Sequence, residues 1–251
     1  MRLFIQLSYD GSSFCGWQVQ ANSPTVQQEV ERALSIVFGE KITVVGAGRT
    51  DTGVNARHFI AHFSLEAVPD GSIAPYLRKI NAILPPAIVA EAFYQVPDSA
   101  HARFDAVSRT YRYYIHTAKD PFARHSCRIW FSPDVEAMNR AALPLLGRHD
   151  FSSFEKTGGA NKTDICTVTE ARWEALDDTH LVFTITADRF LRNMVRATVG
   201  TLLEVGRGRR APEWVADVLE ARDRGQAGQS VIGEALFLED IRYPYPLITI
   251  K

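Results

Sequence analysis

The sequence predicts an α+β protein made of two halves, because strand-like and helix-like hydrophobic patterns follow a similar order in each half of the chain. Residues 2–9 alternate apolar and polar side chains as a half-buried strand does, whereas residues 26–37 carry apolar side chains at helical spacing. The chain has 251 residues, 46% hydrophobic and 23% charged, so it can bury one large core or two smaller ones. This composition is that of a globular protein and excludes a disordered or fibrous one.

The first half contains six predicted elements in the order strand, helix, strand, strand, helix, strand. The first helix has a full set of start signals, because Pro24 precedes it, Thr25 is the expected N-cap and Gln28 completes a capping box. This βαββαβ order is that of a ferredoxin-like unit. The predicted strands are residues 2–9, 41–47, 58–65 and 87–96, and the predicted helices are residues 26–37 and 72–84.

The second half repeats the pattern without repeating the sequence. We place the boundary in a short join within residues 98–107, which gives domains 1–105 and 106–251. Two ferredoxin-like halves with antiparallel sheets are expected to meet at a central cleft, a favoured place for an active site. The predicted strands are residues 108–117, 163–175, 180–188 and 235–243, and the predicted helices are residues 133–146 (with Ser132 as N-cap), 190–205 and 212–222.

Charge and cysteine usage indicate the class of protein. The net charge of −1 argues against a generally basic nucleic-acid coat, but 22 of the 28 basic residues are arginine, which suits a local anionic site. The three cysteines form no CxxC pair and are expected to be reduced thiols. No run of 18 apolar residues occurs and the N-terminus alternates like a strand, so we expect a cytoplasmic protein without a membrane span or signal peptide.

The segment GAGRTDTGV, residues 46–54, is the first candidate for chemistry, and it has three interpretations. It can be a structural turn in which Asp51 accepts hydrogen bonds from local amides. It can be a phosphate-binding loop, although the third glycine and the lysine of such loops are missing and a strand follows. It can carry a catalytic carboxylate: if the segment is extended, Arg49 and Asp51 share a face, and the guanidinium favours the ionised carboxylate.

Arginines gather around the predicted helix 190–205. Arg189, Arg192 and Arg196 follow the spacing i, i+3, i+7 and are expected to form one stripe. The GRGRR segment that comes next adds Arg207, Arg209 and Arg210. A solvated basic helix face and a contact surface for a phosphate backbone are the two interpretations.

The strand SRTYRYYIH, residues 108–116, interleaves arginines with tyrosines. Arg109, Tyr111 and Tyr113 share one face, as RNA-binding surfaces that stack bases and hold phosphates require. Core packing is the alternative, because tyrosine is also a good strand former. No HExxH or similar histidine spacing is present, so no metal ligand is expected.

Six segments, in this order, resemble the tRNA pseudouridine synthase A family along nearly the whole chain. They are YDGSSFCGWQVQ (9–20), TVQQEVERAL (25–34), GRTDTGVNA (48–56), HARFDAVSRTYRYYI (101–115), LLGRHDFSSF (145–154) and FLRNMVRATVGTLLEVGRG (190–208). Asn55, Arg192, Cys166 and Ala235 depart from the residues usual in the family.

The resemblance implies isomerisation of uridine to pseudouridine at nucleotides 38, 39 and 40 in the anticodon stem-loop of tRNA, by a homodimer that needs no metal or cofactor. It implies Asp51 as the catalytic nucleophile, with attack at the sugar C1′, attack at the base C6 and action as a base all left open. Arg49, Tyr111 and Arg196 are implied as active-site support. The arginines implied to contact RNA are Arg189, Arg192, Arg207, Arg209 and Arg210.

Two alternatives remain at this stage. A non-catalytic RNA-binding protein of duplicated ferredoxin-like fold would explain the arginines and tyrosines but gives Asp51 no purpose. A glycosidase-like hydrolase would need a second carboxylate as partner for Asp51, and none stands out in the sequence.

Overall fold

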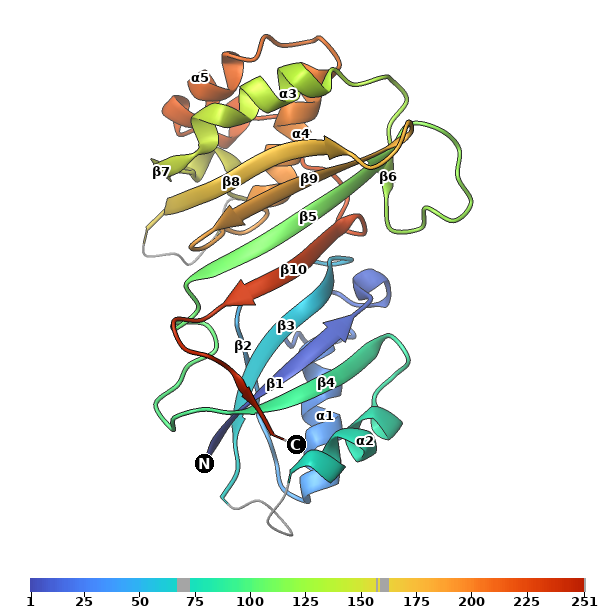
Figure 1. Cartoon of the computed structure of the whole chain (residues 1–251), viewed down its shortest axis with the longest axis vertical. Helices are drawn as coiled ribbons and strands as arrows, with labels where there is room; N and C mark the ends of the chain where they lie inside the picture. The colour runs from blue at the N-terminus through green and yellow to red at the C-terminus, as the bar shows by residue number, and fades with distance from the viewer. Residues whose placement is uncertain (67–72, 157, 159–162, 251) are drawn as a thin grey trace. The chain divides into compact units, whose positions relative to one another are not determined.

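The structure, a computed structural model of the chain, describes residues 1–66, 73–156, 158 and 163–250. The chain divides into two compact units, one formed by residues 1–107 together with the segment from Leu238 onward, the other by residues 108–237. Each unit combines a sheet with helices (Figure 1), which confirms the predicted α+β class. No helix within the described ranges is long and apolar enough to cross a membrane.

The first unit places its strands in the order β11-β4-β1-β3-β10, with β2 beside β3. Strand β1 pairs antiparallel with both β3 and β4. The predicted βαββαβ order is therefore present, although the strand expected at 41–47 is reduced to two residues. The elements are β1 (Arg2–Tyr9), α1 (Val26–Phe38), β2 (Val45–Gly46), β3 (Asn55–Ser64), α2 (Ala74–Ile83), β4 (Ile88–Gln95), β10 (Leu236–Arg242, which begins in the second unit) and β11 (Ile248–Thr249).

One face of β1 is buried along its length, and the other face is buried at Phe4. Leu3, Ile5 and Leu7 alternate along the strand and are fully buried, as the sequence pattern predicts. Phe4, between them, is also fully buried, because its ring lies 5.3 Å from that of Tyr243 in the chain that follows β10. The C-terminal residues therefore complete the core of the first unit, although the sequence pattern predicts them to belong to the second half.

The second unit has the strand order β5-β9-β8-β7, and helices α3, α4 and α5 lie together against it (Figure 1). Strands β5 and β9 pair antiparallel, as do β9 and β8, whereas β6 pairs parallel with β5. The expectation of purely antiparallel sheets is therefore wrong at β6. The elements are β5 (Ser108–His116), β6 (Cys127–Arg128), α3 (Val135–Ala142), β7 (Gly147–Asp150), β8 (Ile165–Ala175), β9 (His180–Ala187), α4 (Met194–Gly206) and α5 (Trp214–Ala221).

The predicted starts of the three helices in this unit are wrong by two to four residues, with α5 beginning at Trp214 rather than at residue 212. Helix α4 begins at Met194 rather than at residue 190, because its N-cap Asn193 has φ 65° in the left-handed region and interrupts the helical backbone. Helix α3 begins after Asp134, whose side chain accepts a hydrogen bond from the Ala137 amide at 2.8 Å. Asp134 therefore caps α3 in place of the predicted Ser132.

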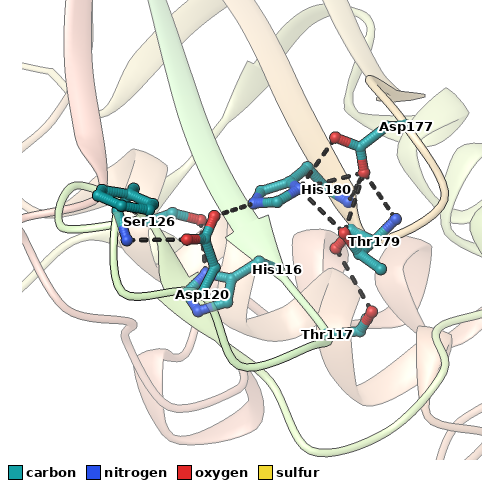
Figure 2. A network of polar contacts seen from close by, with 8 residues as sticks. His116, Thr117, Asp120, Ser126, Asp177, Thr179 and His180 are labelled. Atoms are coloured by element: carbon teal, nitrogen blue, oxygen red, sulfur yellow. Dashed lines mark hydrogen bonds and ion pairs between the residues drawn. The ribbon is translucent and has the colours of Figure 1, made fainter.

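A network of polar side chains joins the end of β5 to the turn between β8 and β9 (Figure 2). The His180 ring lies 3.4 Å from Asp120 through Nε2 and stacks on the His116 ring at 5.8 Å. His116 in turn shares a 2.9 Å hydrogen bond with the Ser126 hydroxyl. Asp120 and Ser126 belong to the segment between β5 and β6, so the network ties this segment to the β8–β9 hairpin.

Candidate active site

Asp51 lies on a loop between β2 and β3, where the chain reverses direction. The Val54 amide donates to the Asp51 carbonyl at 3.1 Å, and Gly53 has φ 79°. This hydrogen bond and the positive φ at the third position are those of a type II turn. Asp51 is half-buried and the next residue, Thr52, is exposed, so the first residue of the turn is partly accessible to solvent.

The backbone of this loop is held by the segment that follows β1. The Trp17 amide donates to the Thr50 carbonyl at 3.1 Å, and the Gly53 amide donates to the Phe14 carbonyl at 3.3 Å. The Tyr9 and Thr50 hydroxyls share a buried hydrogen bond of 2.9 Å. Since these contacts lie on both sides of Asp51 in the chain, they fix the loop that carries it. We call residues 9–18 the clamp segment.

Two glycines allow the clamp segment to approach the loop this closely. Gly16 has φ 87°, and a Cβ there would lie 2.5 Å from the Thr50 carbonyl oxygen. A Cβ on Gly11 would lie 2.1 Å from the Val54 carbonyl oxygen. Both distances are too short for any side chain, so the contact between the two segments requires glycine at these positions.

The clamp segment is fixed in turn to the start of α1. The amides of Val26 and Gln27 donate to the carbonyls of Gly16 and Trp17, at 3.2 and 3.0 Å. Thr25 is the N-cap, as predicted, but its hydroxyl is buried without a hydrogen-bond partner in the described chain. The predicted capping box is therefore wrong, because loop carbonyls take the first-turn amides that a capping side chain would otherwise bind.

The residues that depart from the family pattern have defined surroundings. Asn55 is only 1% exposed, and its side-chain oxygen accepts a hydrogen bond from the Gly11 amide at 2.8 Å, so it holds the clamp segment. Cys166 is buried in β8, where burial raises the pKa of its thiol to about 12. Ala235 is buried and its carbonyl accepts from the Tyr114 amide, whereas Arg192 is exposed.

Arg49 is exposed, and its Nε donates to the Gln18 side chain at 3.2 Å. This contact joins the loop to the end of the clamp segment. The pairing of Arg49 with Asp51 stays a prediction.

Tyr111 and Arg196 belong to the second unit. Tyr111 lies on β5 with its ring edge-on to Phe190 at 5.1 Å. Two residues further on, and on the same face of the strand, Tyr113 is fully buried. Burial raises the pKa of the Tyr113 hydroxyl above its usual range, and the nearby Arg196 guanidinium offsets part of that rise. Tyr111 and Arg196 therefore occupy the same side of this sheet.

Arg196 is held by a segment that runs along α4. Its Nε donates to the Val231 carbonyl at 2.7 Å, and the Val231 amide donates to the Arg196 carbonyl at 3.2 Å. The Asn193 side chain donates to the Ser230 hydroxyl at 2.6 Å. A Cβ on Gly200 would lie only 1.8 Å from the Gln229 carbonyl oxygen, so the helix needs glycine where the segment crosses it. We call residues 228–231 the strap.

The other predicted arginines fall into two groups. Arg189 and Arg192 precede α4, so the predicted stripe with Arg196 on one helix face is wrong. Arg189 donates from Nη1 to the Thr163 carbonyl at 2.7 Å. The second group, which follows α4 and is exposed, consists of Arg207, Arg209 and Arg210.

Sequence reasoning missed the clamp segment as part of the site. The signal for it was the spacing of Gly11 and Gly16 in the segment YDGSSFCGW, but the partner of each glycine is distant in the chain. Among the described residues, no group of three or more histidine, cysteine or acidic side chains is arranged to hold a metal ion.

Comparison with known proteins extends this description. A family model described as tRNA pseudouridine synthase matches residues 141–244. The tRNA pseudouridine synthase A of Bacteroides thetaiotaomicron is 49% identical over 246 residues, which cover 97% of this chain and 91% of the relative. That of Parabacteroides distasonis is 49% identical over 253 residues, which cover 100% of this chain and 99% of the relative. The chain belongs to the tRNA pseudouridine synthase A family.

Family membership confirms the resemblance that the six segments indicated. The tRNA pseudouridine synthase A of Francisella tularensis subsp. tularensis is more distant, at 39% identity over 245 residues, and still covers 96% of this chain and 93% of its own. These matches run over both units, so they include the loop with Asp51 as well as β5 and α4.

Proposed function

We propose that this chain isomerises uridine to pseudouridine at nucleotides 38, 39 and 40 in the anticodon stem-loop of tRNA, with Asp51 as the nucleophile. The observation that carries the proposal is a half-buried aspartate on a loop whose backbone is fixed on both sides, in a chain that belongs to the tRNA pseudouridine synthase A family. A fixed loop suits a nucleophile because a small displacement of the attacking atom lowers the rate strongly.

The reaction conserves the atoms of the nucleotide except for one proton. The bond between N1 and C1′ breaks, the uracil rotates, a bond forms between C5 and C1′, and the C5 proton is exchanged for one at N1. Asp51 can attack C1′, attack C6 or abstract a proton, and these three routes stay open. The target base must leave the stack of the stem first, at an unstacking cost of a few kcal/mol that contacts to the RNA backbone offset.

The remaining groups in this proposal come from both units, Arg49 from the first and Tyr111 and Arg196 from the second. Tyr111 stacks on the target base or transfers a proton, and Arg49 and Arg196 stabilise the charges of the reacting groups. The RNA contacts are assigned to Arg189, Arg192, Arg207, Arg209 and Arg210.

We further propose two ferredoxin-like halves, domains 1–105 and 106–251, with the active site in a central cleft where they meet. The strand orders β4-β1-β3-β2 and β5-β9-β8 support this assignment. The last residues of the second half also pack in the core of the first unit. The working form is proposed to be a cytoplasmic homodimer. It is proposed to need no cofactor, because the isomerisation is redox-neutral.

The test uses unmodified tRNA with tritium at uracil C5. The chain should release tritium to water, and Asp51→Asn should lower that rate by about 10⁴-fold or more while tRNA binding is kept. The matched control is Asp178→Asn, which changes an exposed aspartate and should leave the rate unchanged.

The other functions give different results in the same assay. Liberated free uracil would indicate a hydrolase, and tRNA binding without tritium release would indicate an RNA-binding protein. Full activity of Asp51→Asn would show that Asp51 is not the nucleophile.

A further inference from the structure

Aromatic rings paired with arginines gather in two segments of the second unit; Trp130 is exposed, whereas Phe131 and Trp214 are half-buried. Trp130 is 80% exposed, and the Arg128 guanidinium lies 3.8 Å from the centre of its ring. After α4, the Arg210 guanidinium lies 4.9 Å from the ring of Trp214. Guanidinium groups at these distances are attracted to the face of the ring.

The two segments contact each other. The Arg207 guanidinium, after α4, lies 4.9 Å from the ring of Phe131, next to Trp130. The Asp134 amide donates to the Gly206 carbonyl at 2.8 Å and joins the backbones. We therefore treat the segments as one arginine–aromatic surface, formed by Arg128, Trp130, Phe131, Arg207, Arg209, Arg210 and Trp214.

The three arginines after α4 are exposed, whereas Arg128 is half-buried. Glu204 pairs with Arg207 at 3.4 Å and with Arg209 at 3.5 Å. An arginine that stacks on a ring through its face keeps its N–H edge available for a phosphate, and less side-chain freedom is lost on binding. Four arginines stand against two glutamates, Glu204 and Glu213, in segments 128–131 and 204–214, so the surface favours an anionic partner.

The pairing of β6 with β5 fixes the backbone next to Trp130. In β6, Cys127 pairs with Ile115 and Arg128 pairs with His116, and the Ile129 amide donates to the His116 carbonyl at 2.9 Å. The polar network of Figure 2 holds the segment just before β6 through Ser126. An exposed ring on a fixed backbone is the arrangement by which proteins stack unpaired bases.

We infer that the arginine–aromatic surface binds tRNA outside the modified nucleotide, with Trp130 stacked on an unpaired base and the arginines after α4 on neighbouring phosphates. The inference rests on the proposed function only for the identity of the ligand, tRNA, and assigns no catalytic role to these residues. It adds a stacking contact, at Trp130, to the phosphate contacts proposed for Arg207, Arg209 and Arg210.

The experiment measures the Kd of unmodified tRNA and the rate of tritium release at saturating tRNA. Trp130→Ala should weaken binding roughly tenfold, because a stacked base is lost, and Trp130→Phe should keep most of the affinity. The rate at saturation should be unchanged in both. Phe122→Ala is the matched control, since Phe122 is 89% exposed in the same unit and should leave Kd unchanged.

Two further measurements identify the partner. Trp17 and Trp173 are buried and Trp214 is half-buried, so acrylamide should quench the exposed Trp130 most. Bound tRNA should protect Trp130 from the quencher, and most of this protection should be lost in Trp130→Phe. Arg207→Ala and Arg209→Ala should each reduce the slope of log Kd against log salt concentration by about one.

Three results would overturn the inference. They are an unchanged Kd in Trp130→Ala, an equal loss in Phe122→Ala, and a lower sedimentation mass in Trp130→Ala, which would assign the surface to a second copy of the chain. Normal tritium release together with an unchanged Kd would reject this surface alone. Loss of all tritium release in the unmodified chain would instead reject the proposed function.

Discussion

The loop that carries Asp51 and the region around α4 hold their key side chains in different ways. In the loop, backbone amides and carbonyls on both sides of Asp51 are bound to the clamp segment, and the nearby Tyr9 and Asn55 are buried. Around α4, the arginines are half-buried or exposed, and contacts of their side chains hold them, such as those of Arg207 with Phe131 and Glu204.

The difference follows from what each region is proposed to bind. A nucleophile acts on one atom, so its backbone position has to be fixed to a fraction of an ångström. Phosphates lie at regular intervals along a flexible chain, and contacts to them tolerate small displacements. Substitutions that displace the backbone should therefore lower the reaction rate most when they act on the Asp51 loop. In α4 they should lower the rate only where the strap crosses the helix.

Among substitutions that displace the backbone, Gly16→Ala is expected to lower the rate of tritium release most. The added Cβ would meet the Thr50 carbonyl oxygen at 2.5 Å, so the loop with Asp51 must shift, and we expect tritium release to fall roughly 100-fold. Gly39→Ala is the matched control, because Gly39 has a similar φ of 71° but no atom within 4 Å of the added Cβ. Both variants should lose about 1–2 kcal/mol of stability to backbone strain. Equal tritium release in the two would show that the clamp segment does not position the loop.

A smaller effect is expected for Gly200→Ala, which tests the strap. The added Cβ would overlap the Gln229 carbonyl and displace Val231, the partner of the Arg196 guanidinium. We expect the rate at saturating tRNA to fall roughly tenfold with Kd nearly unchanged. In the control Gly206→Ala, the nearest atoms to the added Cβ all belong to the Met138 side chain and none to the backbone, so the rate should be kept. A loss of affinity in place of rate would assign Arg196 to RNA binding.

The smallest expected effect is a pH dependence of the stability of the first unit. Burial, with Arg2 and His101 nearby, lowers the pKa of His62 to about 4, and Asp105 opposes this only in part. Below pH 6.5 the unfolded chain protonates His62 while the folded unit keeps it neutral, so stability falls between pH 6.5 and 4. The neutral ring accepts a hydrogen bond from the Ala102 amide at 3.0 Å, which protonation at that nitrogen would remove.

Between pH 7 and pH 5 the expected loss is about 1–2 kcal/mol. Urea unfolding at both pH values measures it, and His62→Asn, which keeps an acceptor but does not titrate, should lose correspondingly less. Hydrogen exchange of the Ala102 amide locates the effect in the first unit. The same acid sensitivity in His62→Asn would contradict the assignment.

Long elements with a clear period were predictable from the sequence. The alternation in residues 2–9 and the helical spacing from Val26 gave β1 and α1 almost to the residue. The start of α4 was not predictable, because Leu191 continues the apolar pattern and only the left-handed backbone of Asn193 ends it. Strands of two residues, such as β6 and β11, are too short to show a period.

The site was predictable in its residue types but not in its supports. Asp51 and the arginines stand in recognisable segments, whereas the roles of Tyr9, Gly16 and Asn55 depend on partners about 35 to 45 residues away in the chain. The identity of such partners depends on how the strands pair, and local patterns do not contain it. The capping box failed for a different reason: the amides of the first turn are bound by the carbonyls of Gly16 and Trp17, ten residues earlier, in place of a capping side chain.

The path of the chain through the first unit affects how the protein folds during synthesis. Residues 108–237 are contiguous and can fold as soon as they leave the ribosome, since domains generally fold as units. The first unit begins earlier but needs β10 and β11, including the salt bridge of Arg57 with Glu239 and the hydrogen bond from the Tyr243 hydroxyl to the Ala102 carbonyl. The unit that emerges first therefore reaches its final form last, and a nascent chain stalled before residue 238 would present an unfinished sheet edge beside β3.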